Sequence, residues 1–253
     1  MLRSIKELRG YKILANDGEI GKVHEFYFDD ETWTIRYLVV ETGSWFFERR
    51  VLLSPIVLGQ PHWEAQLFPV NLTMMQVKNS PLIDADKPVS RQIEVELHNH
   101  YGWPYYWIGG GFAGDAMPAL PPQIVSAHLT EEEKKSRAKP ETPDPHLRST
   151  REVIGYHIQA PRGELGHVED FIVDDEAWII RYMVVDTTNW LPGKKVLVPP
   201  LGIEKINWSE AKVRVKLTRA KIKKSPEFDL SAPVSREYEE KLYDFYGWPK
   251  YWL

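Results

Sequence analysis

Short runs of hydrophobic residues, separated by polar turns, fill the beginning of the chain. Many of these runs are rich in β-branched and aromatic residues, which favour strands. The predicted strands are residues 11–15, 19–28, 33–42, 50–58 and 65–72. Residues 16–18, Asn-Asp-Gly, predict a tight hairpin turn, and Gly21 indicates a β-bulge or a close approach of two backbones. Short strands at regular spacing predict a small barrel or sandwich.

The hydrophobic period then changes from that of a strand to that of a helix. Ile93 and Leu97 begin an apolar repeat every four residues, which is one face of a helix. Pro88 suits the start of this helix, and Gly102 lies where a left-handed C-cap is needed. The segment YGWPYYW, residues 101–107, follows. We expect its rings to fold back onto the strands, because large aromatic area stabilises a small core.

The whole pattern occurs twice. Displacing the chain by 145 positions aligns GEIGKVHEFYFDDETWTIRYLVVET with GELGHVEDFIVDDEAWIIRYMVVDT, and YGWPYYW with YGWPKYW. All ten tryptophans fall into matched pairs: Trp33/Trp178, Trp45/Trp190, Trp63/Trp208, Trp103/Trp248 and Trp107/Trp252. This agreement indicates an internal duplication. We predict two modules, residues 1–107 and 147–253, each ending in a helix and the aromatic segment, joined by a glycine-, proline- and charge-rich linker at 108–146.

Composition mainly excludes classes of protein. Hydrophobic residues make up 43% of the chain, which is enough for a core, and the net charge of −4 gives no overall basic field that would attract DNA. The absence of cysteine excludes disulfides and thiolate chemistry. No run approaches the roughly 20 apolar residues of a membrane-spanning helix, and no signal peptide is visible. We expect a soluble, cytoplasmic protein.

Few residues are arranged for chemistry. The Asp-Asp-Glu sequences at 29–31 and 174–176 favour polar turns over a metal site, because aspartate favours turns and the spacing of a calcium loop is missing. His98 and His100 lie two apart on a predicted helix and point in different directions, which favours packing or surface roles. No nucleophile, base and orienting group occur together. We therefore expect no enzyme activity, no metal and no cofactor.

Two equivalent arginines lie within apolar strands. Arg36 and Arg181 could each anchor an anion. A buried arginine without a partner is costly, so we expect each to pair with an acidic side chain, such as Glu19 or Asp30 in the first module.

Aromatic loops with basic residues link two strands in each module, as SWFFERR and NWLPGKK. Aromatic side chains beside basic charge suit a partner surface or a membrane interface; plugging of the barrel end is the alternative. The candidate partner-binding residues are Trp45, Phe46, Phe47, Arg49, Arg50, Trp190, Leu191, Lys194 and Lys195.

A basic run occurs only in the second module, as KVRVKLTRAKIKK. It indicates either a solvated face or a surface for an anionic partner, such as an acidic protein, RNA or anionic lipid. The candidate anion-binding residues are Lys212, Arg214, Lys216, Arg219, Lys221, Lys223 and Lys224.

The pattern G-Y-x-I-x-A-x-x-G-E-x-G-x-V-x-x-F, then D-D-E-x-W-x-I-R-Y-x-V-V, then a valine–leucine strand ending at proline, resembles the PRC-barrel family. That family includes the cytoplasmic domain of the photosynthetic reaction-centre H subunit and the C-terminal domain of a ribosome maturation factor. The resemblance covers residues 2–72 and 147–217, and the helix and YGWP segment resemble extensions in bacterial stand-alone members. It implies a six-stranded β-barrel in each half, and a fold that binds other macromolecules without a known catalytic centre.

Three functional hypotheses follow. The leading one is a non-enzymatic tandem PRC-barrel scaffold or adaptor with a protein partner. One alternative is an RNA- or ribosome-associated factor that uses the basic face of the second module. The other is a peripheral subunit of a membrane complex of the photosynthetic electron-transfer type, although the H subunit's N-terminal membrane helix has no match here. The resemblance alone does not choose among them.

Overall fold

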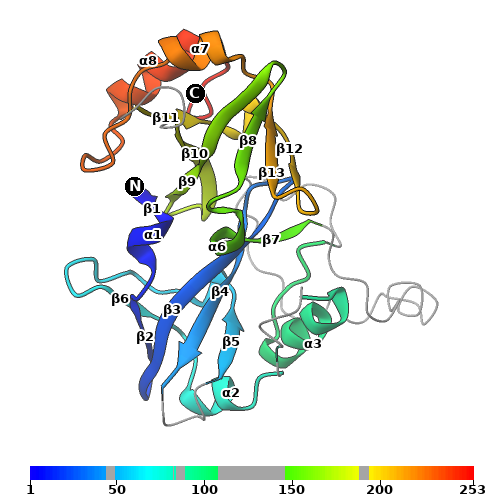
Figure 1. The fold of residues 1–253 in the computed structure, drawn as a ribbon. Helices are drawn as coiled ribbons and strands as arrows, with labels where there is room; N and C mark the ends of the chain where they lie inside the picture. The colour runs from blue at the N-terminus through cyan, green and yellow to red at the C-terminus, as the bar shows by residue number, and fades with distance from the viewer. Residues whose placement is uncertain (44–48, 82, 84–88, 108–145, 188–193) are drawn as a thin grey trace.

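The protein is described from a computed structural model, which covers residues 1–43, 49–81, 83, 89–107, 146–187 and 194–253. Figure 1 shows two sheets, one from each repeat, stacked along the long axis of the molecule. Within these residues the fold is mainly β, with a helix after the strands of each repeat, as predicted. We call the two repeats module 1 and module 2.

The sheet of module 1 has the strand order β5-β4-β3-β2-β6. Its elements in chain order are β1 (Leu2–Ser4), α1 (Ile5–Leu8), β2 (Lys12–Ala15), β3 (Gly18–Asp29), β4 (Ile35–Thr42), β5 (Arg50–Leu53), the 3-10 helix η2 (Pro55–Val57), β6 (Leu67–Pro69), α2 (Met74–Lys78) and α3 (Arg91–Tyr101). Strands β2 and β6 pair in parallel, and the other neighbours in this order are antiparallel.

Module 2 repeats this arrangement in the order β11-β10-β9-β8-β13-β12. Its elements are β7 (Leu147–Ser149), α6 (Thr150–Val153), β8 (His157–Ala160), β9 (Gly163–Asp174), β10 (Ile179–Asp186), β11 (Lys195–Val198), the 3-10 helix η3 (Pro200–Gly202), β12 (Ile203–Asn207), β13 (Lys212–Val215), α7 (Arg219–Lys224) and α8 (Arg236–Tyr246). Here too one neighbouring pair is parallel: β8 and β13, the equivalents of β2 and β6.

Several local predictions are confirmed. Ala15 pairs with Gly18 across the predicted hairpin turn. Gly21 lies so close to the next strand that a Cβ atom there would be 2.0 Å from the carbonyl oxygen of Glu41. Gly102 ends α3 in the left-handed conformation with φ of 70°, as a C-cap glycine should.

Other boundaries were wrong by a few residues. The helices α3 and α8 begin after the serines Ser90 and Ser235, whose hydroxyls accept a backbone N–H three residues on, so serine caps rather than prolines set the start. The predicted strand 50–58 ends at Leu53, because Ser54 and Pro55 turn the chain into η2. The short helices α2 and α7 were not predicted. Thr73 and Thr218 cap their N-termini.

The most consequential feature of the fold is an exchange of the first strand between the modules. Strand β1 of module 1 pairs antiparallel with β9 of module 2, and β7 of module 2 pairs antiparallel with β3 of module 1. In Figure 1 both short strands can be followed across to the opposite sheet. Each sheet therefore contains one strand from the other repeat.

The hydrophobic core is shared in the same way. One continuous cluster of buried side chains runs through both modules. Across the junction, the rings of Phe28 and Phe171 lie 5.5 Å apart and those of Phe26 and Trp178 6.1 Å apart. The two repeats therefore bury part of their apolar surface against each other.

Candidate functional site

The acidic turns are polar turns, each held by its first aspartate. In module 1 the Asp29 carboxylate accepts the backbone N–H groups of Glu31 and Thr32 at 3.0 and 2.9 Å. Burial raises the pKa of this carboxyl, but those hydrogen bonds and the Arg36 guanidinium outweigh burial and hold the pKa below its usual value. The turn prediction is confirmed for this site.

The partners expected for the strand arginines need a correction. Arg36 pairs with Asp29 at 3.0 Å, and Arg181 pairs with Asp174 at 3.0 Å; neither Glu19 nor Asp30 is the partner. Asp29 ends β3 beside the arginine on β4, whereas the next aspartate, Asp30, turns toward the other module. The guanidinium of Arg36 also stacks 3.9 Å from the ring centroid of Tyr106.

A buried carboxylate that the sequence did not single out lies under helix α3. Glu94 is completely buried, and its carboxylate accepts hydrogen bonds from the hydroxyls of Tyr37 at 2.9 Å and Tyr106 at 2.5 Å. Arg91, one turn earlier, forms an ion pair with it at 2.8 Å. Burial raises the pKa of the Tyr37 hydroxyl, so this tyrosine remains a hydrogen-bond donor.

The same arrangement recurs in module 2. The carboxylate of Glu239 accepts the hydroxyls of Tyr182 at 2.6 Å and Tyr251 at 2.7 Å, with Arg236 at 2.9 Å. The sequence did contain a signal, because Arg-x-x-Glu opens the helix in both repeats. The helix was predicted from its apolar periodicity, and charged residues on the buried face do not fit that periodicity. The Arg-x-x-Glu motif therefore did not lead to the prediction of a buried glutamate.

These contacts explain the repeated aromatic heptad. Its second-last residue, Tyr106 or Tyr251, donates to the buried glutamate of its own module. Its first tryptophan stacks on the last residue of the helix, Trp103 on Tyr101 at 4.3 Å between ring centroids. The heptad packs on its own module, as expected, and its tyrosine and tryptophan rings have a structural role.

The two histidines of HNHYG have the packing and surface roles that were expected. His98 is buried, with Nδ1 2.8 Å from the carbonyl oxygen of Pro104 and Nε2 2.9 Å from the Tyr37 hydroxyl. Burial lowers the pKa of His98 to about 4, with nearby Arg91 and Arg36 acting in the same direction. His100 is exposed and contacts the carbonyl oxygen of Gln76 at 2.8 Å.

Acid should therefore weaken the fold through His98. Its pKa falls from 6.5 to about 4 on folding, so between these values the unfolded chain binds a proton that the folded chain does not. We expect the stability contribution to be complete above pH 6.5 and to be lost toward pH 4, at a cost of about 3 kcal/mol.

Urea unfolding between pH 7 and 4 would measure this effect. His98→Tyr, which installs the module 2 residue, should remove that part of the pH dependence, whereas His100→Ala should leave it in place. Equal pH slopes for the parent and His98→Tyr would show that His98 does not titrate as described.

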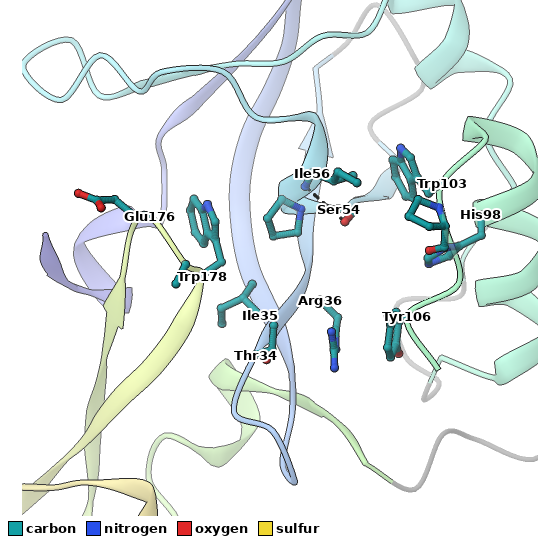
Figure 2. Close-up of a pocket in the computed structure, with 13 residues that line it drawn as sticks. Thr34, Ile35, Arg36, Ser54, Ile56, His98, Trp103, Tyr106, Glu176 and Trp178 are labelled. Atoms are coloured by element: carbon teal, nitrogen blue, oxygen red, sulfur yellow. Dashed lines mark hydrogen bonds between the residues drawn. The ribbon is translucent and has the colours of Figure 1, made fainter. Parts of the chain in front are cut away.

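A cavity of about 350 Å³ lies where the two modules meet. Figure 2 shows Arg36, Ser54, Ile56, Trp103 and other residues of module 1 on its walls, with Trp178 and Glu176 of module 2 closing one side. Its lining is largely apolar and aromatic.

The two repeats differ in sequence at the 3-10 helix beside this cavity. Module 2 has Gly202 where module 1 has Val57, and a Cβ atom at Gly202 would lie 2.8 Å from the ring of Trp248. The glycine therefore lets the Trp248 ring pack closely onto η3. Module 1 has a side chain at the equivalent place, that of Val57, which is 8% exposed.

Large exposed hydrophobic side chains lie at equivalent positions of η2 and η3. Ile56 is 61% exposed and Leu201 is 48% exposed. We call these two residues the apolar tips. Three of the other large exposed hydrophobic side chains, Met1, Leu14 and Met75, have His146, Gln159 and Ala220 at the equivalent positions of the second repeat.

The candidate loop residues are only partly described. Trp45, Phe46, Phe47, Trp190 and Leu191 lie outside the described residues.

The described candidates are basic residues with contacts inside the protein. Arg49 donates from one guanidinium nitrogen to the carbonyl oxygens of Val77 and Lys78 at the end of α2. Lys194 donates in the same way to the carbonyl oxygens of Lys223 and Ser225 at the end of α7. These cations stabilise helix C-termini. Lys195 lies 3.8 Å from both Glu169 and Asp186, and Arg50 pairs with Glu41 in the β4–β5 ladder.

The basic run of module 2 divides between two elements. Lys212 and Arg214 lie on β13, and both are near Glu210, at 4.0 and 3.7 Å. Lys216 follows the strand, with its ammonium group 3.3 Å from the carbonyl oxygen of Leu201. The other four lie on α7, where Arg219 donates to the Glu164 carbonyl, Lys221 approaches the Tyr246 carbonyl, and Lys223 and Lys224 are exposed.

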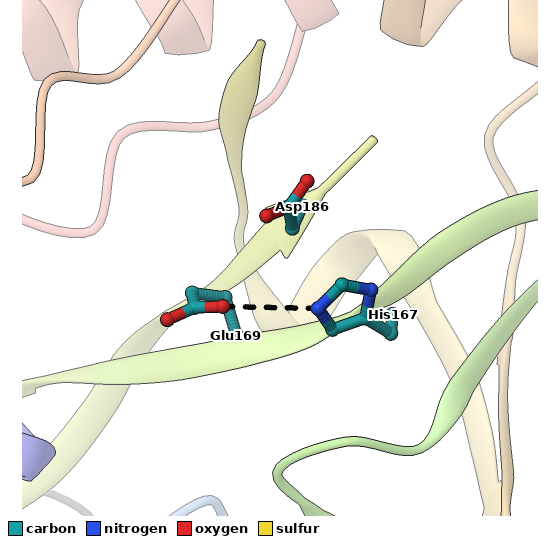
Figure 3. Close-up of side chains that lie close together, drawn as sticks. All are labelled: His167, Glu169 and Asp186. Atoms are coloured by element: carbon teal, nitrogen blue, oxygen red, sulfur yellow. Dashed lines mark ion pairs between the residues drawn. The ribbon is translucent and has the colours of Figure 1, made fainter. Parts of the chain in front are cut away.

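One group of side chains has donor atoms close enough to suggest a metal ion. Within the described residues, His167, Glu169 and Asp186 meet on strands β9 and β10, as Figure 3 shows. Lys6 lies 2.6 Å from Glu169, and Lys195 lies beside both carboxylates. Two ammonium groups already neutralise the charge that a cation would need, so this arrangement favours an ion-pair network.

No helix in the described part of the chain is both long and apolar enough to cross a membrane.

No curated protein matches the chain. The family model of the PRC-barrel domain matches residues 2–60, which include β1 to η2 of module 1. That family consists of non-catalytic interaction modules. The chain thus carries a PRC-barrel domain in its first repeat, and the second repeat has the same strand order over its equivalent elements.

Proposed function

We propose that the protein is a non-enzymatic adaptor that binds a protein partner through its two apolar tips. The observation that carries this proposal is the exposure of Ile56 and Leu201 at equivalent positions of the two modules. An exposed aliphatic side chain is ordinary when it occurs singly. Here the same short 3-10 helix presents one in each repeat, after a proline at the first position.

The surroundings of the tips fit protein recognition. Ile56 borders the apolar cavity between the modules, beside Trp103 and Pro55. Aromatic residues around an apolar anchor are characteristic of the centres of protein interfaces. At the other tip Lys216 contacts the carbonyl of Leu201, which adds a basic group beside the apolar one. A partner segment with an apolar residue next to acidic residues would suit module 2.

Two equivalent tips on one molecule also allow bivalent binding. A partner with two copies of the recognised segment would gain avidity, because the second contact becomes intramolecular. The adaptor proposal therefore expects a larger loss when both tips are changed than the two single changes suggest.

Replacing the tips tests this proposal. Ile56→Asp and Leu201→Asp should each reduce the protein partners captured from the native cell, and the double variant should abolish capture. Met75→Asp, at a side chain that is 60% exposed away from the tips, is the matched control and should leave capture unchanged. Each variant should retain the parent's urea midpoint. Undiminished capture by the folded double variant would refute the adaptor surface.

A second candidate function rests on helix α7. Lys223 and Lys224 are exposed at its end, close in sequence to Lys221 and Arg219, which suits an anionic partner such as RNA. Glu210 beside Lys212 and Arg214 weakens the positive charge on β13, so α7 is the stronger part of this surface. Filter binding of total RNA across a salt series, with Lys223→Gln/Lys224→Gln as the variant, distinguishes this RNA-binding function from the adaptor proposal.

The membrane-peripheral alternative depends on aromatic loop residues that lie outside the described part of the chain.

A further inference from the structure

We infer that the chain is a covalently fused dimer of PRC-type modules, and that each module carries a docking site for the N-terminal segment of another module. We call this segment the hook: residues 2–8 in module 1 and 147–153 in module 2. The docking site is the second half of β3 or β9. The occupant is the hook of a second module, whether or not a linker connects the two.

The two ends of the long strand β3 pair with different modules. The first part of β3 pairs with β2 of its own module, through residues such as Gly21 and Lys22. The last part, Tyr27 to Asp29, pairs with the hook of module 2. Without that hook the same edge of β3 would present unpaired backbone groups, which is an unstable and association-prone arrangement.

Each docking site contains a buried carboxylate that accepts a hydrogen bond from the hook. Asp170 on β9 is 2% exposed and accepts the Ser4 hydroxyl of the hook at 2.5 Å and the backbone N–H of Lys6 at 3.2 Å. In the other docking site Glu25 is also buried and accepts the hydroxyl of Ser149. A buried carboxylate that loses its donors is strongly destabilising. Loss of the hook removes the serine hydroxyl that donates to each carboxylate.

The second aspartate of each acidic turn binds the hook of the opposite module. Asp175 binds Arg3 of the opposite hook at 2.6 Å, and Asp30 binds Arg148 of the opposite hook at 2.6 Å. The two ion pairs are equivalent in the repeat, so the Leu-Arg-Ser sequence of a hook and the second aspartate of a turn form a matched recognition pair. Both pairs join different modules.

The backbone is strained at the junction between the modules. Trp33 and Trp178 adopt left-handed conformations, with φ of 60° and 53°, which cost energy for a side chain of this size. In return each carbonyl accepts a backbone N–H from the other module, Trp33 from Ile180 and Trp178 from Ile35, both at 2.7 Å. The strain is compensated only when two modules are together.

None of these contacts involves residues 108–145, the part of the linker before His146. A protease site placed in the linker of the full-length protein, followed by cleavage under native conditions, tests the inference. We expect the two halves to remain a 1:1 complex with the mass of the intact chain, 29.5 kDa, in native mass spectrometry and gel filtration. Separation of the halves, or their precipitation on cleavage, would overturn the proposal.

The recognition pair provides the matched variant. In the cleaved protein, Arg3→Glu should place like charges against Asp175 and raise the dissociation constant of the halves by tenfold or more. Arg162→Glu changes the same type of residue at an exposed position outside the hooks, and should leave the constant unchanged. Equal dissociation constants for these two variants would show that the hook does not provide the recognition.

Docking between different chains has its own test. Two cleaved preparations, one with a tag on its module 1 half and the other labelled with a heavy nitrogen isotope so that mass spectrometry identifies its halves, are unfolded in urea and refolded together. Capture through the tag should recover untagged module 2 halves from the second preparation. Recovery of the tagged half alone would contradict the inference that a docking site accepts the hook of another copy.

Discussion

Replacing Glu94 with alanine should lower the free energy of unfolding by about 3 kcal/mol, because it leaves the Tyr37 and Tyr106 hydroxyls without their common acceptor and removes the partner of Arg91. Tyr37 is fully buried and has little access to water that could replace the carboxylate. The change also releases the aromatic segment, since Tyr106 is one of the residues that fix it to helix α3.

Equilibrium urea unfolding measures this loss. Glu94→Gln keeps an oxygen acceptor and should cost clearly less than alanine. Glu96→Ala removes an exposed glutamate from the same helix, and should change stability by no more than about 0.5 kcal/mol. If Glu94→Ala and Glu96→Ala were equally stable, the buried network would contribute nothing to folding. The equivalent change, Glu239→Ala, should behave in the same way in module 2.

Gly166→Ala should be more damaging still, with a loss of about 3 kcal/mol or more. A Cβ atom at this position would lie 1.9 Å from the carbonyl oxygen of Asp186, and φ is +131°, where a side chain is rarely tolerated. The atom it meets belongs to the backbone of the neighbouring strand β10. Relief therefore requires β9 and β10 to separate beside the pair formed by His167 and Asp186.

Thermal and urea unfolding of Gly166→Ala and Gly247→Ala give the comparison. Gly247 also has a positive φ, 72°, but a Cβ atom there would meet nothing within 4 Å. Its substitution should cost about 1 kcal/mol from the backbone conformation alone. Equal losses for the two variants would show that the close approach of the strands is unimportant. Gly21→Ala should resemble Gly166→Ala, because its Cβ would lie 2.0 Å from the Glu41 carbonyl oxygen.

Much of this protein could be predicted from its sequence because the deciding forces are local. The hairpin at residues 16–18, the close approach at Gly21 and the C-cap at Gly102 each depend on the backbone preferences of a few neighbouring residues. The duplication needs no structure at all, since the matched tryptophans show it directly.

The partners of side chains were predicted less accurately where two neighbouring residues could each form the same contact. Asp29 and Asp30 are adjacent in sequence, yet one binds Arg36 of its own sheet and the other binds Arg148 of the opposite hook. A strand turns successive side chains to opposite faces, so knowing that an arginine needs an acidic partner does not identify it. Glu94 was missed for a related reason: only the tertiary structure brings two tyrosines from distant segments onto one buried carboxylate.

The exchange of the hooks was decided by tertiary structure alone. Both hooks begin Leu-Arg-Ser, and both docking strands offer a carboxylate at the same place, Glu25 or Asp170. By local pattern, therefore, either hook fits the edge of either docking strand, β3 or β9. The sequence determines the strands, the helices and the repeat, but it does not determine which module a hook joins. That choice depends on the path of the chain and on the reciprocal packing of Trp33 and Trp178, which exist only when both modules are folded together.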